Sequence, residues 1–389
     1  MEQRLEFLMQ ALAGHEAFAE TCQRFGISRK TGYKWQQRYR ELGRQGLRDL
    51  SRAPKHHPQA ISSSMVKRLL DIRQEHPDWG PITIISALKR KGVDGLPAPS
   101  TVGDLFKRSG LVKSRHRRPR RPPGAPPVAD FTAPNRCWCV DFKGQFQMNN
   151  RQWCYPLTMT DGHSRFLLCC DGKNGTDTAG AKKSMERCFA EFGLPDAILS
   201  DNGVPFSSVG AGGLSQLSVW WVKLGIRPLR ITRGKPQQNG RHERMHRTLQ
   251  QNVADSPADS MPRQQRALDA FRLEYNTERP HRALDGKTPA DLYVPSPKPL
   301  PATVESIAYP GHHQLRSVRS DGSIKWRGST LFLSEALQGE VVGIKELADD
   351  RGLIRFGPVD LAVLDERGSE PELFRLPHPS SPGAQACPG

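Results

Sequence analysis

The stretch LSDNGVPF, residues 199–206, places an acid, Asp201, directly after a short apolar run and before an Asn-Gly pair. Asp-Asn-Gly commonly ends a strand, because the aspartate side chain hydrogen-bonds the backbone that follows it. That interpretation explains the turn and gives the carboxylate no further role. The alternative is a carboxylate placed at the end of a buried strand to do chemistry. The sequence on either side decides between the two.

Two other acids stand in unusual positions. Asp141 lies inside the strand-like pattern CWCVDFKG, where a charge is costly unless it is paired or faces a groove. Glu243 lies early in a long helix expected from about Pro236 to Val253. Three acids from three segments match a site for a hard cation, since Mg²⁺ takes carboxylate oxygens and keeps positions for water and phosphate. Two such ions would serve an in-line displacement at phosphorus.

The composition indicates a polyanionic partner. The 389 residues include 57 Lys and Arg against 40 Asp and Glu, a formal net charge of +17. Nucleic acid is the first candidate partner and an anionic membrane the second. No apolar run is long enough to span a bilayer, and Met1 opens no signal pattern, so we expect a cytoplasmic protein with no membrane partner. The eight cysteines lack paired zinc spacing, and we interpret them as reduced and mostly buried.

The first 50 residues predict an N-terminal helix-turn-helix domain. Apolar residues from Phe18 to Phe25 repeat at helical spacing, Gly26 supplies a tight turn, and Ser28 caps the next helix. An ordinary helical hairpin with a solvated face is the alternative. We favour DNA binding, because the second helix is basic where a recognition helix meets the major groove. Its candidate DNA contacts are Arg29, Lys30, Lys34 and Arg38.

Residues 61–112 again show three helical patterns, and we interpret them as a second helix-turn-helix domain. Residues 113–129 are dense in Arg and Pro, a composition that favours extended backbone and cannot form a core. This linker is either a solvated hinge or a segment that follows phosphates, and we favour the second. Its candidate DNA contacts are Arg115, Arg117, Arg118, Arg120 and Arg121.

From residue 130 the apolar period changes to that of strands. Three strand-like runs are followed by a helix, the strand that ends at Asp201, a helix, a strand and the long helix. This order predicts an α/β domain over residues 130–295, with a mixed five-stranded sheet and flanking helices. Residues 305–370 have short strands split by Gly-containing turns and predict a small β-barrel-like domain. Residues 371–389 predict a disordered tail.

Four fragments carry a family resemblance: VDFKG, LSDNGVPF, GKPQQNGRHERMHRTL and YNTERPHRALDGKTPADLY. Together they resemble the integrase core of bacterial insertion-sequence transposases and retroviral integrases, over about residues 130–295. The resemblance implies a ribonuclease-H-like fold with Asp141, Asp201 and Glu243 as the Asp-Asp-Glu (DDE) catalytic residues and metal ligands. It also implies two Mg²⁺ ions as cofactor, with Mn²⁺ able to substitute.

The implied function is DNA transposition in a bacterial cell. Such a protein binds the terminal inverted repeats of a mobile element, cuts the strand, and transfers the 3′-hydroxyl into target DNA, as at least a homodimer on double-stranded DNA. The sequence has no phosphate loop, so no nucleotide cofactor is expected. Two alternatives stay open. One is a catalytically inactive, sequence-specific DNA-binding protein, and the other is a ribonuclease-H-like nuclease, although helix-turn-helix units suit duplex DNA better than RNA.

Two departures from the family pattern matter. Between Asp201 and Glu243 lie 41 residues, a few more than in most relatives, and we assign the excess to a loop at 207–216 that we expect to be mobile. Relatives carry basic residues four and seven positions after the glutamate, which here are Arg247 and Gln250. The candidate DNA contacts near the acids are Lys143, Lys235, Arg241, Arg244 and Arg247.

Two neighbours of the acids have competing interpretations. Asp161, in TMTDGHS, lies near the expected site, and we interpret it as a turn residue rather than a catalytic one. His242, beside Glu243, is either a phosphate contact or a solvated histidine.

Overall fold

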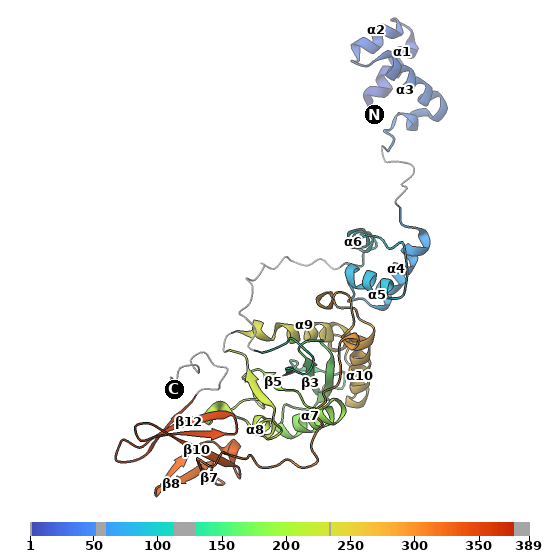
Figure 1. The fold of residues 1–389 in the computed structure, drawn as a ribbon. Coiled ribbons are helices and arrows are strands. Elements are labelled where there is room, and N and C mark those ends of the chain that lie inside the picture. The colour runs from blue at the N-terminus through green and yellow to red at the C-terminus, as the bar shows by residue number, and fades with distance from the viewer. Residues whose placement is uncertain (1, 52–59, 113–128, 233–234, 377–389) are drawn as a thin grey trace. The chain divides into compact units, whose positions relative to one another are not determined.

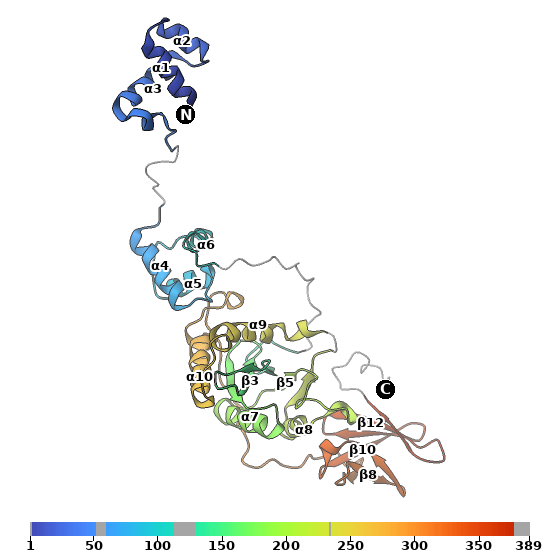
Figure 2. The same cartoon turned by 180° about the vertical axis from the view of Figure 1, so that it is seen from behind.

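The structure, a computed structural model, describes residues 2–51, 60–112, 129–232 and 235–376 (Figures 1 and 2). The chain divides into two compact units, Met1–Ser62 and Ser63–Gly389. The predicted linker and its five arginines lie outside the described residues. Among the described residues, no helix combines the length and apolar character needed to cross a membrane.

The N-terminal unit is a three-helix fold with a tight turn between its second and third helices. Ser28 caps the third helix as predicted, its Oγ accepting a hydrogen bond from the Thr31 backbone N–H at 3.2 Å. Phe7 lies at the centre, with edge-to-face contacts to the rings of Phe18, Phe25 and Trp35. The elements are α1 (Glu2–Ala13), α2 (Phe18–Arg24), α3 (Arg29–Leu42) and the 3₁₀ turn η1 (Gly43–Leu47).

The second helical segment has the three helices that its sequence predicts. Leu69, Ile84, Val102 and Phe106 are fully buried and form its core. The helices are α4 (Ser63–Glu75), α5 (Pro81–Arg90) and α6 (Pro99–Arg108).

The central domain has a mixed sheet in which three antiparallel strands are followed by two parallel ones. β3 pairs with β4 and β1, β5 lies parallel to β1, and β6 lies parallel to β5. A two-residue strand, β2, also pairs with β3, so the sheet has six strands and not the predicted five. The strands are β1 (Trp138–Phe142), β2 (Phe146–Gln147), β3 (Trp153–Asp161), β4 (Leu167–Lys173), β5 (Ala197–Ser200) and β6 (Arg227–Arg230).

Helices cover both faces of this sheet (Figure 1). Trp138 and Leu168 pack with the first two helices, whereas Leu167 and Cys170 pack with the last two, because an irregularity in the pairing of β3 with β4 interrupts the alternation at Leu168. The long helix predicted from about Pro236 is present in three parts, η3, α9 and η4. The elements are α7 (Thr178–Phe192), α8 (Gln216–Lys223), η3 (Pro236–Asn239), α9 (Gly240–Leu249), η4 (Gln250–Ala254) and α10 (Met261–Thr277). Two 3₁₀ turns follow, η5 (Arg282–Leu284) and η6 (Pro289–Asp291).

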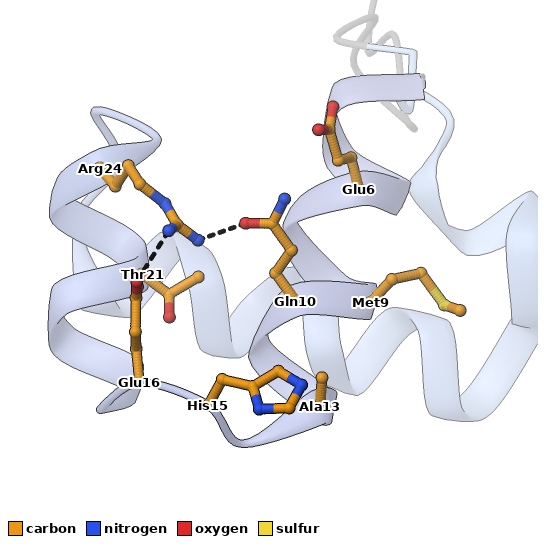
Figure 3. A pocket seen from close by; sticks show the side chains of 8 residues that line it. All are labelled: Glu6, Met9, Gln10, Ala13, His15, Glu16, Thr21 and Arg24. Atoms are coloured by element: carbon orange, nitrogen blue, oxygen red, sulfur yellow. Dashed lines mark hydrogen bonds and ion pairs between the residues drawn. The ribbon is translucent and has the colours of Figure 1, made fainter.

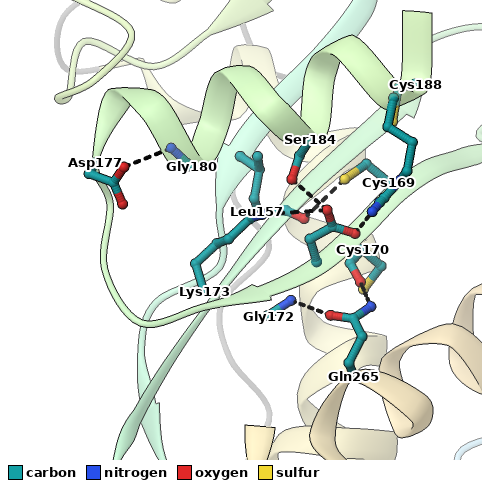
Figure 4. Close-up of polar contacts among 12 residues, drawn as sticks. Leu157, Cys169, Cys170, Gly172, Lys173, Asp177, Gly180, Ser184, Cys188 and Gln265 are labelled. Atoms are coloured by element: carbon teal, nitrogen blue, oxygen red, sulfur yellow. Dashed lines mark hydrogen bonds and ion pairs between the residues drawn. The ribbon is translucent and has the colours of Figure 1, made fainter. Parts of the chain in front are cut away.

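The cysteines behave as small apolar residues. Figure 4 shows Cys169 and Cys170 on β4 and Cys188 on α7, where Cys188 Sγ donates to the Leu168 carbonyl at 3.7 Å. All seven cysteines among the described residues are buried and free, as predicted. Burial is the first cause that raises the pKa of the Cys170 thiol far above its ordinary value.

In the part of the chain that the structure describes, three ion pairs connect the α4–α6 segment to the central domain within the second unit. Arg279, just after α10, pairs with Asp78, whose side chain is only 5% exposed. His76 Nδ1 lies 3.1 Å from Glu274 Oε1. The third pair joins Arg90 and Asp291.

The C-terminal part consists of an antiparallel five-stranded sheet in the order β13-β12-β11-β10-β7 and a two-stranded sheet of β8 and β9. Both sheets are open, so the barrel-like closure predicted for residues 305–370 is not confirmed. The strands are β7 (His313–Ser317), β8 (Ser323–Trp326), β9 (Ser329–Phe332), β10 (Val341–Leu347), β11 (Arg351–Phe356), β12 (Val359–Asp365) and β13 (Glu372–Arg375), with the turn η7 (Glu335–Leu337).

The disordered tail predicted for residues 371–389 is wrong for its first part. Residues 372–375 form β13, because their backbone pairs with the exposed edge of β12, a partner that the tail composition does not reveal. Residues 377–389 lie outside the described residues.

Candidate active site

Two of the three predicted acids lie at the ends of neighbouring parallel strands. Cys139 of β1 lies opposite Leu199 of β5, and two residues further along each strand are Asp141 and Asp201. The carboxyl ends of parallel strands meet at one edge of a sheet, which brings the two carboxylates together. The Asp201 side chain also accepts a hydrogen bond from the Gly203 N–H at 3.0 Å. Asp201 therefore stabilises the turn and also places its carboxylate beside that of Asp141.

Glu243 comes to the same edge from α9. Met245 and Leu249 of this helix are buried against β4 and α10, which leaves Glu243 on the exposed side. Burial, then the charge of Asp201, then that of Glu243 raise the pKa of Asp141 to about 7. The structure thus brings the three acids within electrostatic range of one another.

The donor set fits a divalent cation. The Phe142 backbone N–H interacts with the Asp141 carboxylate, and His246 Nδ1 lies 3.9 Å from Asp141 Oδ2, beyond hydrogen-bond length. Carboxylate oxygens that converge without a compensating cation repel each other, and hard cations such as Mg²⁺ prefer such ligands.

The burial of Asp141, together with this repulsion, predicts a pH dependence of stability in the metal-free protein. The pKa of Asp141 is raised on folding, so the folded state holds this proton more tightly than the unfolded chain, and stability falls as pH rises from about 4 to about 7. Asp141→Asn removes the effect. In chelator, the melting temperature of the variant relative to wild type should rise by a few degrees between pH 5 and pH 8. A constant difference across this range would contradict the uncompensated cluster.

Two histidines of α9 pack against β3 beneath the acids. His242 is 1% exposed, with Nε2 2.8 Å from Thr158 Oγ1 and Nδ1 2.8 Å from Thr160 Oγ1. Its interpretation as a solvated histidine or phosphate contact is wrong, because it lies on the sheet-facing side of the helix. His246 Nε2 lies 2.7 Å from Thr158 Oγ1.

Burial lowers the pKa of His242 well below its ordinary value. Burial, and then the nearby charge of Lys143, lower the pKa of His246 to about 3. Sequence reasoning missed Thr158, Thr160 and His246 as parts of the site. The signals were available, since threonines two apart share a strand face and histidines four apart share a helix face.

Some of the predicted DNA contacts bind other parts of the protein, and several are exposed to solvent. Arg38 donates to the Arg48 carbonyl at 2.6 Å, and Arg241 donates to the Gly162 carbonyl at 2.8 Å while lying over the Phe131 ring. Lys143 is half-buried beside the acids, and burial lowers its pKa. The exposed ones are Arg29, Lys30, Lys34, Lys235, Arg241, Arg244 and Arg247.

Asp161 is a turn residue, as predicted. It is fully buried and accepts hydrogen bonds from the Asn135 N–H at 2.8 Å and from the Ser164 N–H at 2.7 Å. These contacts leave its carboxylate engaged in holding the chain and not facing the three acids.

The loop at 207–216 was expected to be mobile, and the structure corrects this. Ala211 and Leu214 are fully buried in the core of the β domain, and the Ala211 N–H donates to the Leu333 carbonyl at 3.2 Å. The glycines suggested mobility, but they serve close packing: a Cβ at Gly212 would lie 2.8 Å from Leu361 Cδ2. The segment that follows Asp201 is therefore anchored to the C-terminal domain.

Gly212→Val should destabilise the protein by about 2–4 kcal/mol, because the residue has φ +62° and the new side chain would collide with Leu361. Gly225→Val is the matched control: it has φ +76° and nothing within 4 Å of a new Cβ, so it reports the backbone strain alone. Thermal unfolding compares the two. An equal loss in both variants would show that the loop is not packed as described.

The comparisons with known proteins agree with this fold. Residues 132–236 and 224–289 each match an Integrase core domain family. Residues 3–55 match a Helix-turn-helix domain family and residues 31–106 a Homeodomain-like domain family. The "Insertion element IS407 uncharacterized 31.7 kDa protein" of Burkholderia multivorans is 24% identical over 248 residues, covering 62% of this chain and 86% of that protein.

Viral proteins are also similar over the core. The Gag-Pol polyprotein of baboon endogenous virus is 29% identical over 175 residues, which are 45% of this chain and only 10% of the polyprotein's length. The HTLV-2 integrase catalytic core domain in complex with magnesium is 17% identical, with a TM-score of 0.33, covering 42% of this chain and 99% of that one. The simian T-cell lymphotropic virus intasome gives 17% identity and a TM-score of 0.38, covering 79% of this chain and 95% of that one.

The chain therefore carries an integrase core domain behind helix-turn-helix domains. The predicted resemblance to insertion-sequence transposases with a retroviral-integrase-like core is confirmed.

Proposed function

We propose that this protein is a DDE-type DNA transposase that binds the terminal inverted repeats of a mobile element and joins their 3′ ends to target DNA. The observation that carries the proposal is the convergence of Asp141, Asp201 and Glu243 at one edge of the sheet. Each acid comes from a rigid element, β1, the end of β5 or α9, which is what a preorganised catalytic site needs.

The three carboxylates would hold two Mg²⁺ ions, with Mn²⁺ able to substitute, and such ions supply an activated attacking oxygen and charge neutralisation at phosphorus. In the first reaction a water oxygen forms the new P–O bond and the P–O3′ bond breaks, which frees a 3′-hydroxyl. In the second that hydroxyl attacks a target phosphate, and one ester replaces another. Neither step needs a redox partner or a nucleotide.

Target and element DNA would be held by the helical domains, with at least two copies of the protein acting on the two ends together. In the N-terminal unit, the start of α3 presents Arg29, Lys30 and Lys34 to solvent. Ser28 fixes where this helix begins, so the basic residues stand at its N-terminal end, where base edges and phosphates are contacted in such motifs.

Lys34→Ala should weaken DNA binding several-fold and reduce the slope of log affinity against log salt by about 1, the value expected for one phosphate contact. Arg24→Ala is the matched control, because it removes the same charge from the same unit. Arg24 donates to Glu16 at 2.8 Å and to Gln10, and the three line a hollow between α1 and α2 (Figure 3). If both variants lost the same salt dependence, the change would be due to net charge alone, and Lys34 would not contact a phosphate.

A joining assay tests the proposal against its rivals. Purified protein and Mg²⁺ are mixed with a plasmid and with labelled DNA that ends at the border of the natural element with a free 3′-hydroxyl. Covalent joints between the label and the plasmid support a transposase. A nuclease would give cuts without joints, and a catalytically inactive DNA-binding protein would retain the DNA unchanged.

A further inference from the structure

Thr158 determines the tautomers of the two histidines beneath the acids. Its hydroxyl has one hydrogen, which it donates to the Asp141 backbone carbonyl at 3.0 Å. The two lone pairs of the same oxygen must then accept from His242 Nε2 at 2.8 Å and His246 Nε2 at 2.7 Å. Both imidazoles therefore carry a proton on Nε2.

The two rings differ in what Nδ1 contacts. In His242 the Nδ1 lone pair accepts from the Thr160 hydroxyl at 2.8 Å, so both of its nitrogens are satisfied by the protein. In His246 no hydrogen bond among the described residues reaches Nδ1, which instead faces Asp141 Oδ2 at 3.9 Å. A lone pair aimed at a carboxylate oxygen is unfavourable, unless a cation lies between them.

The distance fits such a cation. Transition-ion bonds to imidazole nitrogen and carboxylate oxygen are each about 2.1 Å, so two ligand atoms of one ion lie roughly 3–4 Å apart. The ligand atoms of Asp141, His242 and His246 all lie within 4.8 Å of one another. Because His242 is already satisfied, His246 is the nitrogen ligand that remains. Thr158 takes the place of the outer hydrogen-bond acceptor that orients a metal-binding imidazole.

We propose that His246 Nδ1 is a ligand of the ion held by Asp141, so that the site takes one imidazole nitrogen besides its carboxylates. This inference rests on the proposed function, because the ion is the one that the three acids bind. Imidazole nitrogen suits first-row transition ions such as Fe²⁺, Ni²⁺ and Zn²⁺, whereas Mg²⁺ and Ca²⁺ prefer oxygen ligands. His246 therefore raises the affinity of the site for transition ions, Mn²⁺ included, relative to its affinity for Mg²⁺.

Mn²⁺ binding to the purified full-length chain without DNA tests this by electron paramagnetic resonance. Pulsed measurements on the wild type should show ¹⁴N coupling from a bound imidazole, and ¹⁵N-histidine labelling should change it. His246→Gln should abolish the coupling and weaken Mn²⁺ binding by at least ~10-fold, with a smaller change for Mg²⁺ measured by competition. His242→Asn should keep the coupling, since that ring binds only threonines.

The outcomes separate this inference from the proposed function. If Mn²⁺ binds to the wild type and is lost in Asp201→Asn, but no ¹⁴N coupling is seen, then His246 is not a ligand and the three-acid site stands. If Mn²⁺ binding is unaffected by both Asp141→Asn and Asp201→Asn, the acids do not form the metal site and both proposals fail. The wild-type coupling shows whether a histidine binds the ion, and its loss in His246→Gln with retention in His242→Asn assigns it to His246.

Discussion

Asp201→Asn is expected to reduce strand cleavage and strand joining by roughly 10³-fold or more, while the affinity for DNA changes little. The substitution keeps the shape of the side chain and its hydrogen bond with the Gly203 N–H, but it removes the charge from the end of β5. Only the charge is needed to hold a cation beside Asp141. The rate of appearance of new 3′ ends on DNA that carries the element borders measures the effect.

Asp196→Asn is the matched control for this loss. Asp196 lies just before the other end of β5 and pairs on the surface with Arg136 at 3.0 Å and with Lys298. The same chemical change there should leave cleavage within about twofold of wild type, because exposed ion pairs contribute little to stability. Cleavage by Asp201→Asn at more than a tenth of the wild-type rate would contradict a catalytic role for the acid.

Arg279→Ala is expected to have the largest effect on stability, a loss of about 3–5 kcal/mol. Arg279 pairs with Asp78, and the two side chains are only 15% and 5% exposed, so its removal leaves a buried carboxylate without a cation. The loss should appear in calorimetry as a lower melting temperature, and it should loosen α4–α6 from the central domain. Arg263→Ala is the control, because the Arg263–Asp259 pair is 64% and 52% exposed and should change stability by less than ~1 kcal/mol. Similar losses in both variants would show that the Arg279 pair does not anchor the segment.

The sequence predicted the parts of this protein that depend on local pattern. The change from helical to strand period near residue 130 marked the central domain, and the cap at Ser28 marked the start of α3. Asp141 and Asp201 were identified because each breaks an apolar run, and such a break needs a reason.

The rest depends on contacts between residues far apart in the chain. His242 is buried because it lies on the face of α9 that packs against β3. The sequence of α9 alone does not show which face of the helix packs against the sheet. The loop at Ala211 is anchored by the carbonyl of Leu333, and Asp78 meets its cation at Arg279. The loop at 207–216 was expected to be mobile, but its small residues allow it to pack closely against the C-terminal domain.

The most direct test of the proposed transposase uses a plasmid that carries the gene with its natural flanking DNA. Purified wild-type protein and Glu243→Gln are each incubated with it and Mg²⁺, and all new 3′ ends and joints are sequenced. We expect defined ends on both sides of the element and joined products with the wild type, and neither with Glu243→Gln, which should still bind the DNA. Cleavage that persists in Glu243→Gln, or a wild-type protein that binds the DNA but makes no new end even with Mn²⁺, would contradict the DDE mechanism.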